Sequence, residues 1–206
     1  MAKIDEDKDL ALVEQLLFKP RGLNVQRFSQ AELRTTRTPD FRVFKGARHV
    51  AHCEVKSPND PWLDNLLDAA PPGTIVGGLR DDPTFNRLSR HIQKAASQFE
   101  AVDPTRQLPS ILAFVNHDKN SGFPDLMEVL TGFRRFDDGS SALTMPEIAW
   151  GRLKDVKFKI DLYVMINARN ARVENRAFSQ SNPNHVQTLC ELLGLDPSRI
   201  RPALID

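Results

Sequence analysis

Residues 41–56 have the pattern of two extended segments joined by a tight turn, and this strand pair constrains the fold most. The first segment begins just after Asp40, and the second ends at Lys56. Because successive side chains of a strand point to opposite faces, Glu54 and Lys56 share one face. Asp40 lies on that face if it is directly or diagonally opposite Glu54. The pair then brings two carboxylates and an ammonium to one point.

The turn sets the register of this pair. Direct opposition of Asp40 and Glu54 pairs Lys45 with His49 and leaves residues 46–48 as a three-residue loop. Such loops usually need a residue with positive φ, most often glycine, and Gly46 is available. The alternation also predicts that His49 and His52 lie on opposite faces, so no zinc-binding histidine pair is expected.

Two converging carboxylates repel each other unless a cation is bound between them. Carboxylate oxygens are hard ligands, which suit Mg²⁺ or Mn²⁺. A lysine beside such an ion would face a bound water or phosphate. The three groups therefore predict a site that cleaves phosphodiester bonds.

The stretch Thr38-Pro39-Asp40, followed by Glu54-Val55-Lys56, resembles the signature of the PD-(D/E)xK nuclease superfamily, which has the restriction-endonuclease-like fold. The resemblance implies an α/β fold with a mixed central sheet flanked by helices. It also implies that Asp40, Glu54 and the Val55 carbonyl bind the metal, and that Lys56 positions or activates the attacking water. The similarity covers about residues 5–118.

The flanking elements agree with the order that the superfamily core requires, which is a helix, three meandering strands, a helix and a strand. Apolar spacing predicts helices over residues 9–18 and 84–100, and the short apolar run over residues 110–116 is typical of a buried strand. Residues 74–79 are a candidate for the third strand of the meander.

Glu14 lies inside the apolar stripe of the first predicted helix. A carboxylate in that position is costly unless something pairs with it. The resemblance implies one reading, in which Glu14 completes the metal site. The alternative is a glutamate at the margin of the stripe that reaches solvent or an arginine.

Candidate nucleic-acid contacts lie on the second predicted helix and just before the motif. Lys94 and Gln98 are four residues apart on one flank of the helix, and Arg87 is on a nearby face. Arg37 belongs to a group of arginines that precedes Asp40. Solvated side chains are the alternative for each of these residues.

The chain has 206 residues with 28 Lys and Arg against 27 Asp and Glu, a formal net charge of +1. This balance is not the strongly basic one of a protein that binds nucleic acid tightly through phosphates, so a homodimer or a partner protein could supply part of the affinity. No apolar run has the length of a membrane span, and the first residues lack an apolar signal segment. We therefore expect a cytoplasmic protein without a membrane partner.

The last part of the sequence, about residues 119–206, predicts further elements of the same sheet. Residues 1–206 are therefore expected to form one nuclease-like domain with this C-terminal extension. Residues 156–166 alternate as a half-exposed strand should, and a closing helix is expected over residues 184–193, ending at Gly194.

These features predict a Mg²⁺-dependent endonuclease that hydrolyses DNA with a metal-activated water. DNA is preferred because most of the superfamily cuts DNA. The alternatives are an RNA-cleaving toxin or effector, and a catalytically inactive nuclease fold that serves as a nucleic-acid-binding or assembly subunit.

Overall fold

A mixed six-stranded sheet forms the centre of the molecule in a computed structural model, which describes residues 5–58, 66, 69–74, 83–118, 121–179 and 182–196. The strand order is β1-β2-β3-β4-β7-β8. The strands are β1 (Asn24–Arg27), β2 (Phe41–Lys45), β3 (Arg48–Lys56), β4 (Ser110–Asn116), β7 (Leu162–Asn167) and β8 (Arg172–Phe178). β1, β2 and β3 form an antiparallel meander, β3, β4 and β7 run parallel, and β8 is antiparallel to β7.

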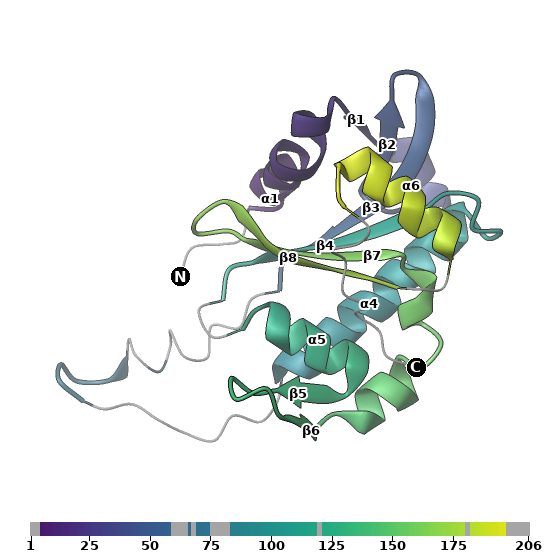
Figure 1. The fold of residues 1–206 in the computed structure, drawn as a ribbon. Helices are drawn as coiled ribbons and strands as arrows, with labels where there is room; N and C mark the ends of the chain where they lie inside the picture. Colours follow the sequence, from purple (N-terminus) through teal and green to yellow (C-terminus); the bar gives the residue numbers. More distant parts are fainter. Residues whose placement is uncertain are drawn as a thin grey trace.

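Helices cover both faces of this sheet (Figure 1). One face carries α1 (Glu6–Val13), continued by the π-helix η1 (Glu14–Phe18), and α6 (Pro183–Leu193). The other face carries α4 (Pro83–Val102) and α5 (Phe123–Thr131). Shorter elements complete the described structure: η2 (Lys19–Arg21), α2 (Gln30–Thr35), a separate hairpin of β5 (Phe133–Arg135) and β6 (Ser141–Leu143), η3 (Glu147–Arg152) and η4 (Lys157–Lys159).

Two buried apolar cores hold these layers together, one on each face of the sheet. The side chains of β4 alternate between them: Ile111 and Val115 pack on the α1 and α6 side, whereas Leu112 and Phe114 pack on the α4 and α5 side. The predicted α/β architecture, with a mixed sheet flanked by helices, is therefore confirmed.

The turn between β2 and β3 differs from the prediction. Lys45 pairs with Arg48, so the loop has two residues, and Gly46 takes the first position with a φ of +62°. The extra residue lies in β3 instead, where a β-bulge at Val50 follows from the pairing of Val43 with Ala51 and of Phe44 with His49. Because of the bulge, the residues of β3 beyond Val50 have the same partners in β2 that a three-residue loop would have given them. Arg42 therefore pairs with His52, as direct opposition of Asp40 and Glu54 requires.

The meander begins before the motif. Its first strand is β1, which pairs with β2 along its whole length. The predicted strand over residues 74–79 lies outside the described residues except for Thr74, which is in no strand. β1 escaped prediction because it is short and polar, with Asn24, Gln26 and Arg27 exposed at the sheet edge.

The prediction of one half-exposed strand over residues 156–166 was wrong. Residues 157–159 form η4, and the strand β7 starts only at Leu162. From Leu162 to Ile166 every side chain is buried, because β7 lies between β4 and β8 with helices over both faces. The closing helix is confirmed: α6 is capped by Asn182, whose side chain accepts hydrogen bonds from two backbone N–H groups, and ends at Gly194 in the left-handed conformation.

Within the described parts of the chain, no helix is both long enough and apolar enough to cross a bilayer.

Candidate active site

Asp40 directly precedes β2 and lies beside β3. Its Oδ2 accepts a hydrogen bond of 2.7 Å from the Val55 N–H. The neighbouring pair is Phe41 with Cys53, so Asp40 lies opposite Glu54 across the two strands. This contact holds the Asp40 carboxylate beside Glu54, as the sequence predicts.

Glu54 is buried in the middle of the sheet, with 1% of its surface exposed. The pKa of Glu54 is raised from its ordinary value of 4.5 to about 7, first by burial and then by the neighbouring Asp40 carboxylate, against the opposing effect of Lys56. One oxygen, Oε1, forms an ion pair with the Lys56 ammonium. No N–H or O–H donor of the described residues reaches the other oxygen, Oε2, although Glu54 can hydrogen-bond to the Asp40 carboxyl when the two acids share a proton. A buried carboxylate oxygen without a partner is unfavourable unless a cation or a donor reaches it.

One flank of α4 faces this cluster. Arg87, His91, Lys94 and Gln98 follow each other at intervals of four, three and four residues, so they share one side of the helix. Gln98 is buried, and its Nε2 donates a hydrogen bond of 2.6 Å to the Thr38 carbonyl. This bond ties α4 to the segment that carries Asp40.

The pKa of His91 reflects the positive charges around it. Its pKa is lowered to about 4, first by burial and then by the positive charges of Lys56, Arg87, Lys94 and Arg90. The imidazole is therefore neutral at neutral pH and lies in a positive field. The carboxylates are thus bordered by cations on α4, an arrangement that attracts phosphate groups.

The other predicted contact residues differ in position. Lys94 is exposed and Arg87 is half-buried on the α4 flank. Arg37 is exposed three residues before Asp40, in the connection between α2 and β2. The structure thus brings Lys94, Gln98 and Arg87 onto the helix that borders the carboxylates, whereas Arg37 lies on the chain that leads into β2.

Glu14 is not part of the cluster. It pairs with Lys19 at 3.4 Å, and 32% of its side chain is exposed. The segment that carries it packs on the sheet face that buries Cys53 and Val55, which is opposite to the face of Glu54. The reading of Glu14 as a residue at the margin of the helix is therefore the one that the structure supports.

The buried acid of the first helix is Asp9. Its carboxylate lies 2.9 Å from the His117 ring Nε2 and also accepts a hydrogen bond from the Ser57 hydroxyl. These contacts join α1 to the chain just beyond β3 and β4. They hold the helix on the sheet and do not involve Asp40 or Glu54.

The donor set suits one hard divalent cation. Asp40 and Glu54 supply carboxylate oxygens, and the Val55 carbonyl belongs to the residue that directly follows Glu54 in β3. No group of three or more His, Cys, Asp and Glu side chains that could bind a metal occurs in the described residues. Such an ion would therefore take its remaining ligands from the backbone, water or substrate, as Mg²⁺ commonly does.

The prediction that His49 and His52 lie on opposite faces was wrong. The bulge at Val50 reverses the parity of β3, so the two rings lie edge to face with centroids 4.6 Å apart. Both line a cavity of about 410 Å³. The sequence carries no signal for this pair because a bulge depends on packing across the strands.

The fold and the cluster together describe an α/β protein with paired acids and a lysine at adjoining strands of a mixed sheet. No protein-family model, curated protein or solved structure gives a significant match to the chain.

Proposed function

We propose that this protein is a metal-dependent nuclease that hydrolyses phosphodiester bonds in DNA, with a fold of the restriction-endonuclease-like type. The order α1, β1 to β3, α4, β4 is the order that the superfamily core requires. The antiparallel meander and the parallel pairing of β3 with β4 add further support.

The observation that carries the proposal is the state of Glu54. Its carboxylate is buried beside the Asp40 carboxylate, and no N–H or O–H donor among the described residues reaches its Oε2. A protein gains nothing in stability from this arrangement, since burying acids together is unfavourable. A bound cation would remove that cost, which favours a functional reason for the cluster.

Mg²⁺ or Mn²⁺ held by Asp40, Glu54 and the Val55 carbonyl would supply a Lewis acid that polarises the phosphate and activates water. Lys56 keeps its ammonium on the same strand face, where it orients the attacking water or stabilises the negative charge that develops on the phosphate. The Val55 N–H holds the Asp40 carboxylate in place. Gln98 holds the Thr38 backbone, two residues before it.

The α4 flank supplies the nucleic-acid contacts in this proposal. Arg87 and Lys94 border the cluster and would bind phosphates of the strand on either side of the cleaved bond. DNA is proposed over RNA by analogy with the superfamily. The formal net charge of +1 favours modest affinity that a dimer or a partner protein would increase.

The test is a cleavage assay with plasmid, single-stranded DNA and structured RNA, each with Mg²⁺, Mn²⁺ or EDTA. We expect the wild type to cleave DNA only with a metal ion, and Asp40→Asn and Lys56→Ala to lose at least about 100-fold in rate. Glu14→Gln is the matched control, because Glu14 lies outside the cluster and its loss should leave the rate unchanged.

Metal binding is measured separately by isothermal titration calorimetry with Mn²⁺. Saturable binding to the wild type, lost in Asp40→Asn, supports the site independently of cleavage. Cleavage of RNA alone would favour the effector alternative. Binding of nucleic acid without cleavage, unchanged by either substitution, would refute the enzymatic proposal and favour a non-catalytic subunit.

A further inference from the structure

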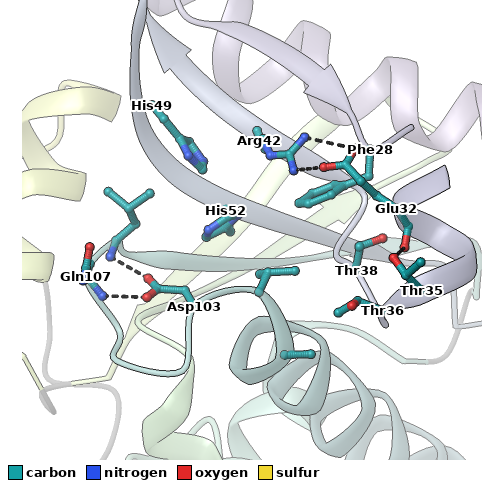
Figure 2. Close-up of a pocket in the computed structure, with 13 residues that line it drawn as sticks. Phe28, Glu32, Thr35, Thr36, Thr38, Arg42, His49, His52, Asp103 and Gln107 are labelled. Atoms are coloured by element: carbon teal, nitrogen blue, oxygen red, sulfur yellow. Dashed lines mark hydrogen bonds and ion pairs between the residues drawn. The ribbon is translucent and has the colours of Figure 1, made fainter. Parts of the chain in front are cut away.

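A cavity of about 410 Å³ is lined by His52, which is two residues from Glu54 on β3, and by Thr38, which is two residues before Asp40 (Figure 2). It lies between α2, the paired strands β2 and β3, and the chain that follows α4. Neither Asp40 nor Glu54 lines it. The cavity has the size of a small-molecule site and exceeds what packing defects leave in a protein interior.

Flat groups form its walls. The rings of Phe28 and His52 are nearly parallel, at 25° with centroids 6.3 Å apart, and His49 meets His52 edge to face. The Arg42 guanidinium lies over the Phe28 ring at 3.8 Å and pairs with Glu32. Figure 2 shows these side chains lying next to one another over the strands. Aromatic rings and guanidinium planes are the surfaces on which unpaired bases stack.

Unpartnered polar atoms accompany the flat walls. Thr38 and His52 are among the residues that line the cavity, and their Oγ1 and Nδ1 atoms are buried without a hydrogen-bond partner in the described part of the protein. Thr38 is 7% exposed and His52 is 5% exposed. The two ring nitrogens of a histidine can donate and accept hydrogen bonds. This mixture suits the edge of a nucleobase.

The cavity is adjacent to the proposed reaction centre along the same strands. His52 and Glu54 are two residues apart on one face of β3, and Thr38 is two residues before Asp40. Two residues of a strand span roughly 7 Å. A nucleotide whose phosphate lies at the carboxylates can therefore place its own base, or that of its neighbour, in the cavity.

We infer that the cavity binds one unstacked nucleobase of the substrate strand and holds that strand in position for cleavage. This inference rests on the proposed nuclease function, because it takes the strand from that reaction. It adds a binding site for the base, distinct from the residues that bind the metal and the phosphate. The flat walls stack the base, and Thr38 and His52 contact its edge.

The experiment uses single-stranded DNA pentamers in EDTA, so that binding is measured without cleavage. Each internal position is replaced in turn by an abasic site, which removes the base and keeps the phosphates. The blocking variant is Thr36→Phe, at an exposed residue that lines the cavity. Gln30→Phe is the matched control, because Gln30 is exposed on α2, the helix that Thr36 directly follows, and does not line the cavity. Circular dichroism verifies that both variants are folded.

We expect one abasic position to weaken wild-type binding by about tenfold or more, the effect of losing one stacked base. Thr36→Phe should bind intact DNA as weakly as the wild type binds that abasic DNA, with no further loss at the abasic site. Ring resonances of His52 should shift on DNA binding in the wild type and in Gln30→Phe, but not in Thr36→Phe. Equal binding of intact and abasic DNA, an unaffected Thr36→Phe, or the absence of binding would each refute the inference.

The outcomes also separate the inference from the proposed function. Metal-dependent cleavage without an abasic effect would refute the base site and leave the nuclease in place. An abasic effect that Thr36→Phe removes, in a protein that cleaves nothing, would support the base site and refute the nuclease.

Discussion

Glu54→Gln should change how the stability of the metal-free protein depends on pH. In the folded protein, the pKa of Glu54 is raised from 4.5 to about 7, mainly by burial. The folded state therefore holds a proton that the unfolded chain releases, and ionising Glu54 at higher pH destabilises the fold. The wild type should be most stable below about pH 4.5 with respect to this group, lose stability up to about pH 7, and level off above it.

The size of the effect follows from the two pKa values. Each pKa unit corresponds to about 1.36 kcal/mol, so the full range is worth about 3 kcal/mol. Between pH 5 and pH 8 the wild type should lose about 2 to 3 kcal/mol relative to Glu54→Gln. The substitution also removes the ion pair with Lys56. That pair forms only when Glu54 is ionised and already contributes to its pKa, so the slope against pH is the diagnostic quantity.

The assay is urea unfolding in EDTA, followed by circular dichroism at several values between pH 5 and pH 8. Glu14→Gln is the control, and its profile should run parallel to that of the wild type. Addition of Mn²⁺ at pH 8 should stabilise the wild type and leave Glu54→Gln nearly unchanged. Parallel pH profiles of wild type and Glu54→Gln would show that ionising the buried Glu54 does not destabilise the fold. A cation at the proposed metal site would then have no such cost to offset.

Three further outcomes test other parts of the structure. Gly46→Ala should destabilise the fold by about 1 kcal/mol in urea unfolding, because its φ of +62° disfavours a side chain, whereas Gly151→Ala, with open space and no such φ, should be nearly neutral. Asp161→Ala should lower the unfolding free energy by about 3–5 kcal/mol, since it leaves Arg106 and the buried His185 without their carboxylate. Lys94→Gln should reduce the slope of log affinity for DNA against log salt by about 1, which fluorescence anisotropy measures, and an unchanged slope would remove Lys94 from the interface.

Local patterns in the sequence determined most of the element order. Apolar spacing places α4, β4 and α6 correctly, because periodicity reports which side of an element is buried. The same local rule brings Glu54 and Lys56 to one strand face. The cluster with Asp40 was predictable because the strands that carry it are neighbours in the chain, joined by a short turn.

Only the tertiary structure decided which residues meet across longer distances. The bulge at Val50 moves His49 to the face of His52 and so forms the wall of the cavity. Helix packing puts Glu14 on the far side of the sheet and buries Asp9 instead. The position of β7 between β4 and β8 buries both of its faces. The alternation of apolar and charged residues just before β7 instead predicts a half-exposed strand. Periodicity cannot report these outcomes, since each depends on strand register or on contacts between segments far apart in the chain.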